Sequence, residues 1–220
     1  MAKRLGIDAL AEMARKLGLG MVYPCGLPQQ KAGVIPDGDW KRAQTNTSWL
    51  GGETVLAGIG QGYVLATPLQ LAVMTARVAT GRAVVPALER GGQQGRAFEF
   101  PALDIDERHL QAVRDAMVAA VNEDGGTGVK AALGDAQSIV AGKTGTSQVS
   151  QASSDGAQDA LTWEERDHAL FVAFVPASKP RFAISAIIEH GGGGGATAAP
   201  LVRDCIEAVL EAFPQHGQQG

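Results

Sequence analysis

A lysine set between glycines and hydroxyl side chains lies in the segment 141–149, which reads AGKTGTSQV. Lys143 can supply a fixed positive charge with three hydrogen-bond donors. Thr144 and Thr146 are two residues apart, so on a strand their hydroxyls share one face, and Gly145 between them lets a ligand lie against the backbone. This arrangement suits an extended peptide that pairs with the strand and ends in a carboxylate.

A phosphate-binding loop is the alternative that Gly-Lys-Thr suggests. Such a loop needs a glycine five positions before Gly142, and that position is occupied by Gln137. It also leads directly into a helix whose N-terminus faces the anion, whereas Thr144 is followed by a glycine and then by residues that favour a strand. The sequence therefore favours carboxylate binding over nucleotide binding.

The composition is that of a globular protein without a basic surface for nucleic acid. The 220 residues are 45% hydrophobic and 19% charged, with a formal net charge of −4. The sequence has no apolar run of membrane-spanning length and no signal peptide, so any anchor is expected outside this chain. Cys25 and Cys205 are far apart and match no metal-ligand spacing, so we expect two unpaired thiols, no metal and no cofactor.

Helices are predicted where a capping residue precedes an apolar stripe of period 3.6. The clearest begins with Thr67-Pro68-Leu69-Gln70, a capping box with proline in the first turn, and ends at Gly81. Others are predicted to begin at Asp8, with Leu10, Met13, Ala14 and Leu17 inward, and at Asp104 or Asp106. The last is predicted from Ala198 to Phe213, with Leu201, Cys205 and Val209 inward.

Strands are predicted towards the C-terminus, where the apolar period changes. The segments 138–149, 169–175 and 182–189 are joined by short or polar connections, which favours an antiparallel meander with the last helix packed on it. Residues 150–166 are expected to form a polar loop, and the five glycines at 191–195 a flexible connection.

Together these elements predict an α+β fold. Residues 1–137 are expected to be mostly helical, with a long loop over 20–55, and residues 138–220 to hold the three-stranded antiparallel sheet and the C-terminal helix. Trp40 and Trp49 are expected to anchor the long loop. His168 begins a buried strand and is interpreted as a structural histidine.

Several segments resemble the penicillin-binding proteins, in order and over nearly the whole chain. Lys143-Thr-Gly is the third motif of that family and of class A β-lactamases. Gly58-Ile-Gly-Gln-Gly-Tyr63 followed by Ala66-Thr-Pro-Leu-Gln70 is similar to the GIGQG…TPLQ segment of the transpeptidases. Three shorter segments are similar to the elongation-specific class B enzymes, namely Trp49–Thr54, Asp167–Ala169 and Glu189–Gly192.

The resemblance implies a partial penicillin-binding transpeptidase or serine β-lactamase-like fold, and a D,D-transpeptidase that cross-links peptidoglycan. In that family a serine attacks the D-Ala-D-Ala stem peptide, and β-lactam antibiotics trap the resulting acyl-enzyme. The resemblance implies that Lys143 supplies charge and hydrogen bonds and that Thr144 and Thr146 lie by the substrate carboxylate. It further implies that Gly145 keeps the strand face clear and that the Thr146 amide contributes to the oxyanion hole.

The first two motifs of the family are absent from the sequence. No serine is followed by lysine at the third position after it or by asparagine at the second. Both motifs precede Lys-Thr-Gly in the family, so residues 1–220 are interpreted as the C-terminal portion of a single transpeptidase domain, inactive alone. The sheet then lacks strands beside 182–189, and an unpaired edge there favours self-association.

The resemblance also implies a location and partners. The whole protein is expected at the periplasmic face of the bacterial inner membrane, with a role in cell-wall synthesis and cell shape. Its expected partners are a membrane glycosyltransferase and elongation-complex proteins, and no nucleic acid.

Two other functions remain open, a serine β-lactamase-like enzyme and a non-enzymatic penicillin-binding sensor or scaffold domain. A Ser-x-x-Lys in the intact gene supports an enzyme, and its absence supports a scaffold.

Overall fold

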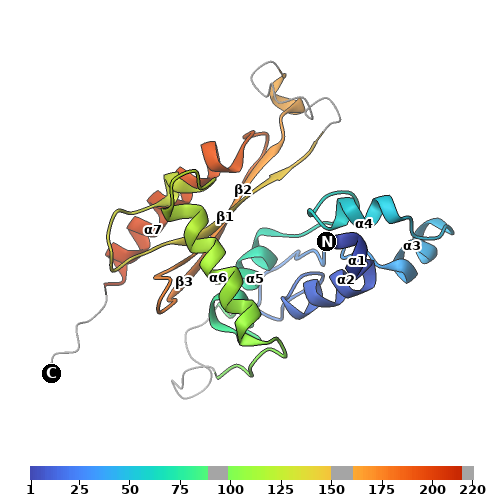
Figure 1. Cartoon of the computed structure of the whole chain (residues 1–220), viewed down its shortest axis with the longest axis horizontal. Helices are drawn as coiled ribbons and strands as arrows, with labels where there is room; N and C mark the ends of the chain where they lie inside the picture. Colours follow the sequence, from blue (N-terminus) through green and yellow to red (C-terminus); the bar gives the residue numbers. More distant parts are fainter. Residues whose placement is uncertain (89–98, 150–160, 215–220) are drawn as a thin grey trace. The chain divides into compact units, whose positions relative to one another are not determined.

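The computed structural model describes residues 1–88, 99–149 and 161–214. The chain forms two compact units, Met1–Leu110 and Gln111–Gly220. Figure 1 shows helices and long connections in the first unit, and a small sheet with the C-terminal helix in the second.

The first unit is helical in its described part. Its helices are α1 (Ala2–Leu5), α2 (Ile7–Lys16), α3 (Gly38–Thr45), α4 (Gly51–Ala57) and α5 (Pro68–Thr80), and α6 (Glu107–Asn122) begins at its end. The predicted start of α6 is confirmed, because Asp106 Oδ1 accepts a 2.9 Å hydrogen bond from the Arg108 backbone N–H.

Helix α5 follows its sequence signals closely. Thr67 Oγ1 accepts from the Gln70 N–H at 3.2 Å, and Gln70 Oε1 accepts from the Thr67 N–H at 3.3 Å, so both sides of the predicted capping box are formed. Gly81 ends the helix in the left-handed conformation. Gln70 is also buried, and its amide donates to the carbonyl oxygens of Met21 and Ala32. One capping residue therefore also holds the segment before α3.

The expectation of a long loop over 20–55 is wrong, because α3 lies within this range and α4 begins in it. Asp37 caps α3 by accepting from the Trp40 N–H at 2.7 Å. The buried residues of these two helices are Lys41 and Thr54, which are polar. Because no apolar stripe marks either helix, hydrophobic periodicity could not detect them.

Two helix faces also differ from the prediction. Helix α2 begins at Ile7 rather than at an Asp8 cap. It buries Ile7 and Ala11, and of the predicted stripe Leu10, Ala14 and Leu17 are half-buried whereas Met13 is exposed. In the C-terminal helix the buried stripe contains Val202 and Ile206, one position on from the predicted Leu201 and Cys205, which are exposed. The C-terminal helix has apolar residues on both stripes, so periodicity alone cannot choose between them.

The second unit confirms the predicted α+β fold and antiparallel meander. Strands β1 (Ala141–Ser147), β2 (His168–Val175) and β3 (Phe182–Ile188) form a sheet in the order β1-β2-β3. The described part of this unit also holds most of α6, the short helical turns η1 (Val129–Ala131), η4 (Trp163–Glu165) and η5 (Gly194–Ala198), and the last helix, α7 (Ala199–Ala212). Of the loop predicted at 150–166, residues 150–160 lie outside the described residues.

One face of the sheet packs on α7 around a single large side chain. The core combines alternate residues of β2 with α7, and its largest members include Phe171, Val202 and Ile206. A methyl group added at Gly142 would lie 2.7 Å from the Phe171 ring, and one added at Gly128 would lie 2.9 Å from it. The Phe171 ring can occupy this position only because both residues are glycine. Full burial of the ring contributes roughly 1.5–3 kcal/mol to the stability of the fold.

The glycine run at 191–195, which the sequence predicts to be a flexible connection, is closely packed at several of its glycines. Gly192 and Gly194 are buried, and η5 begins within the run as a turn of π-helix. A methyl group at Gly194 would lie 2.5 Å from the Gly145 carbonyl oxygen, and one at Gly195 would collide with the Thr127 carbonyl oxygen. The glycines are thus needed for close backbone approach, which composition alone does not distinguish from flexibility.

Candidate active site

The predicted site residues lie on β1, an edge strand of the sheet formed by the described residues. Thr144 is paired with Phe171 and Thr146 with Ala169, both of which are buried. Residues opposite each other on a ladder point to the same face, so the prediction that the two threonines share a face is confirmed. Lys143 belongs to the opposite face by alternation, and its side chain is exposed.

The ammonium group of Lys143 nevertheless reaches the threonine next to it. Its Nζ donates to the Thr144 carbonyl oxygen at 2.8 Å and to Thr144 Oγ1 at 3.2 Å. Because a lysine ammonium can only donate, Thr144 Oγ1 accepts here and keeps its own proton for another partner. The structure therefore places a cation and a hydroxyl donor side by side at the edge of the sheet.

Thr127 is a member of this cluster that the sequence analysis missed. Its Oγ1 lies 3.0 Å from Thr144 Oγ1, although the two residues are 17 positions apart. Thr127 belongs to the turn between α6 and η1, where Gly126 and Gly128 flank it. The run Gly-Gly-Thr-Gly at 125–128 signals a turn, but nothing in it indicates that the turn meets β1.

Of the two remaining predicted residues, Thr146 is open to solvent and Gly145 is tightly packed. Thr146 is exposed, and Ser147, which ends the strand, is paired with His168. A methyl group at Gly145 would lie 3.2 Å from Leu170 Cβ on the neighbouring strand. Gly145 is thus in close contact with β2 on one side and with the Gly194 backbone on another, so the strand cannot accept a side chain there without displacement.

Two histidines meet beside the end of β1. The His190 backbone N–H donates to His168 Nδ1 at 3.0 Å, and the two rings lie 4.7 Å apart, edge to face. Trp163 lies against His190, with ring centroids 4.4 Å apart. Asp167, which is buried, accepts from the Val149 N–H at 3.1 Å just beyond the strand. The interpretation of His168 as a structural histidine agrees with its acceptance of a backbone hydrogen bond.

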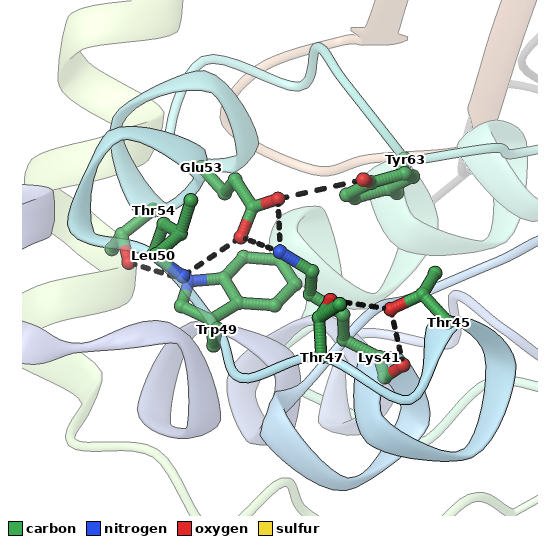
Figure 2. Close-up of polar contacts among 8 residues, drawn as sticks. All are labelled: Lys41, Thr45, Thr47, Trp49, Leu50, Glu53, Thr54 and Tyr63. Atoms are coloured by element: carbon green, nitrogen blue, oxygen red, sulfur yellow. Dashed lines mark hydrogen bonds and ion pairs between the residues drawn. The ribbon is translucent and has the colours of Figure 1, made fainter.

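A second polar cluster lies in the first unit, between α3 and α4 (Figure 2). The buried Lys41 Nζ contacts both carboxylate oxygens of Glu53, with 2.6 Å to Oε2. Tyr63 donates to Glu53 at 3.4 Å, and the indole N–H of Trp49 donates to Thr54 Oγ1 at 2.8 Å. The ion pair between Lys41 on α3 and Glu53 on α4 therefore joins these two helices.

The charge of Glu53 is stabilised by these contacts. Hydrogen bonds from Lys41 and from the Leu50 backbone N–H lower the pKa of the Glu53 carboxyl below its usual value. Trp40 and Trp49 both lie near Tyr63 with their rings tilted against it, and their ring centroids are 5.3 and 6.2 Å from that of Tyr63. The expected role of the two tryptophans as anchors agrees with this packing, although the segment that they anchor contains helices.

Other features of the described residues do not add a reactive group. A groove of about 470 Å³ is lined by the end of α6 and by residues 129–139, and the four predicted site residues do not line it. Cys25 is buried and Cys205 exposed, and both are free thiols. Within residues 1–88, 99–149 and 161–214, no group of three or more potential ligands could hold a metal ion. Across the same ranges, no helix combines the length and apolarity that a membrane span requires.

Comparison with known families gives one match over nearly the whole chain. Residues 1–207 match the penicillin-binding protein transpeptidase domain. Two proteins named peptidoglycan D,D-transpeptidase MrdA are 35% identical to this chain, one from Haemophilus influenzae and one from Acinetobacter baumannii. The matches cover 98% and 96% of this chain but 35% and 32% of those proteins, so the chain spans about a third of the length of these relatives.

Two solved structures share the fold. Penicillin-binding protein 2 of Helicobacter pylori, solved in complex with MreC, superposes with a TM-score of 0.82 at 30% identity over 96% of this chain and 37% of its own. Pseudomonas aeruginosa PBP2, solved in complex with WCK 5153, superposes with a TM-score of 0.81. It is 34% identical, and the match covers 98% of this chain and 46% of its own.

Proposed function

The chain belongs to the penicillin-binding protein transpeptidase family, and from this premise we propose that it is the C-terminal part of a peptidoglycan D,D-transpeptidase. The observation that carries the proposal is the pairing of Lys143 with the Thr144 hydroxyl on an edge strand. A cation and a hydroxyl donor on an edge strand of the described sheet suit a peptide that ends in a carboxylate. The D-Ala-D-Ala end of a stem peptide is such a ligand, and a β-lactam is a rigid analogue of it.

The proposed roles follow from these positions. Lys143 supplies positive charge and hydrogen bonds, Thr144 and Thr146 lie by the terminal carboxylate, and the Thr146 backbone N–H donates to the carbonyl oxygen that becomes negative during acyl transfer. Gly145 leaves room for the peptide. Thr127 shares a hydrogen bond with Thr144 and so orients its hydroxyl towards the ligand.

The nucleophile must come from outside this chain. No serine here has lysine at the third position after it, so the family's Ser-x-x-Lys is expected in the remainder of the gene product. That serine attacks the penultimate D-Ala carbonyl, the terminal D-Ala leaves with the serine proton, and an amine of a second stem peptide then takes the acyl group and restores the serine. We therefore propose that residues 1–220 are the C-terminal portion of one catalytic domain and are inactive alone.

The subclass is proposed from the named relatives. MrdA proteins of Haemophilus influenzae and Acinetobacter baumannii are among them, and the Helicobacter pylori structure is a complex with MreC. We propose a role in cell-wall elongation and cell shape, at the periplasmic face of the inner membrane, with elongation-complex proteins and a membrane glycosyltransferase as partners. Self-association of the isolated chain through the edge of β3 remains a prediction, which size-exclusion chromatography can test.

The release of D-Ala tests the proposed reaction. The full product of the gene should release D-Ala from a D-Ala-D-Ala-terminated peptide in the presence of an acceptor amine, and the Lys143→Ala variant should release it much more slowly. Cross-linked product should form together with the D-Ala. Hydrolysis without cross-linking would instead favour a β-lactamase-like or carboxypeptidase reaction, and no release at all would favour a scaffold.

A further inference from the structure

The turn after β3 is fixed by residues that begin β2. The His190 N–H donates to His168 Nδ1 at 3.0 Å, and the Gly192 N–H donates to the Asp167 carbonyl oxygen at 2.8 Å. His190 itself is in the left-handed conformation, with φ of 54°, which is uncommon for a residue other than glycine. The turn at 189–193 is therefore held by specific hydrogen bonds.

The position of this turn determines how the candidate site is packed. Two residues after Gly192, Gly194 lies against the backbone of Gly145, so that an added methyl would be 2.5 Å from the Gly145 carbonyl oxygen. Gly195 approaches Thr127 and Thr144 in the same way, with an added methyl 3.5 Å from Thr144 Cγ2. A displacement of the turn would consequently move the backbone that supports the predicted carboxylate-binding residues.

The hydrogen bond at His168 requires one protonation state. A ring nitrogen accepts only when it carries no proton, so His168 must be neutral with its proton on Nε2. His190 has the opposite requirement, because its Nδ1 lies 3.1 Å from the Arg166 carbonyl oxygen and must donate to it. His190 can therefore be neutral or charged in this arrangement, whereas protonation of His168 removes the acceptor.

We propose that neutral His168 is a positioning residue that holds the glycine-rich turn against β1, and that its protonation releases the turn and loosens the site. The ionisable residues around His168 in the described structure include the His190 ring, Asp167 and Arg166 before β2, Glu189 at the start of the turn, and Glu164 and Glu165 on η4. On β1 its partner is Ser147, which does not ionise in this range, and η4 contributes Trp163 against His190. The inference concerns the geometry of the site and does not depend on the proposed reaction.

Backbone amide exchange in the 220-residue chain tests this proposal. Protection of a peptide covering 189–195 is measured at about pH 8 and about pH 5, on either side of the range in which imidazoles ordinarily titrate, and corrected for the intrinsic exchange rate. We expect protection to fall roughly tenfold at the lower pH, as for the loss of one buried hydrogen bond. Equal protection at both pH values would overturn the proposal, and so would no protection at either.

Three variants separate positioning from general stability. His168→Asn places an amide oxygen where Nδ1 was and cannot titrate, so protection should persist at both pH values. His168→Leu has no acceptor, so protection should be low at both. His109→Asn removes an exposed imidazole on α6 and should behave as the wild type. A pH response retained in His168→Asn would contradict the assignment.

The tautomers of the two rings give a test that needs no variant. Nitrogen NMR of the labelled chain near pH 8 should show His168 protonated at Nε2 and His190 at Nδ1. The reverse assignment for His168 would exclude the hydrogen bond on which the proposal depends.

Discussion

Two lysines of this chain have opposite surroundings. Lys41 is buried, and its ammonium lies between both carboxylate oxygens of Glu53. Lys143 is exposed, and the partners that the structure gives its ammonium are a carbonyl and a hydroxyl oxygen, which are neutral. Neutral partners leave the charge of Lys143 available to an anion, whereas Glu53 neutralises that of Lys41. The first lysine therefore joins two helices, and the second is suited to bind a ligand.

The largest effect is expected from removing the exposed lysine. In the full gene product, Lys143→Ala should slow acylation by benzylpenicillin about 100-fold or more, because the cation that attracts the carboxylate of the penicillin is lost. The melting temperature should change little, since the side chain is exposed. The acylation rate is measured with labelled penicillin, and the melting temperature is measured by a thermal melt of the same preparation. An unchanged rate would remove Lys143 from the site.

The buried lysine should show the reverse pattern. Lys41→Met leaves the Glu53 carboxylate partly buried without its cation, and the melting temperature of the first unit should fall by roughly 10 °C. Lys143→Met is the matched control and should melt as the wild type. A stable Lys41→Met variant with impaired penicillin acylation would mean that the two lysines have been assigned the wrong way round.

The glycine-rich turn offers a smaller test of the same comparison. Gly194→Ala places a methyl group against the Gly145 carbonyl oxygen, and it should slow acylation roughly tenfold by displacing β1. Gly193→Ala is the matched control, because a methyl there meets nothing within 4 Å. Similar rates for the two variants would show that the close approach of Gly194 does not position the site.

The smallest effect is expected in the thermal stability of the first unit, which should depend on pH. The pKa of Glu53 is lowered in the folded chain by Lys41 and by the Leu50 N–H, from an ordinary value of 4.5. A lowered pKa contributes stability that is present above the unfolded value and is lost as pH falls through the folded value. Tryptophan fluorescence should therefore report weaker thermal stability below about pH 4.5. Glu53→Gln should flatten this dependence, while Glu207→Gln, in an exposed pair with Arg203, should not.

The sequence was a good guide where structure is decided locally. The Thr67 capping box and the strand that carries Lys143 are set by residues a few positions apart, and the strand order follows the succession of the strands along the chain. The sequence failed where distant segments meet. Thr127 reaches Thr144 only after α6 and β1 have packed, and α3 and α4 are held by buried polar contacts that have no period. The buried stripe of α7 was missed because both of its apolar stripes fit the pattern equally well.

Intact mass spectrometry after incubation with excess benzylpenicillin tests the central claim most directly. The 220-residue chain should gain no mass, because it contains the carboxylate-binding strand but no Ser-x-x-Lys serine. The full gene product in the same experiment should gain one penicilloyl group. A stoichiometric adduct on a serine of the 220-residue chain, or no adduct on the full gene product, would contradict the account.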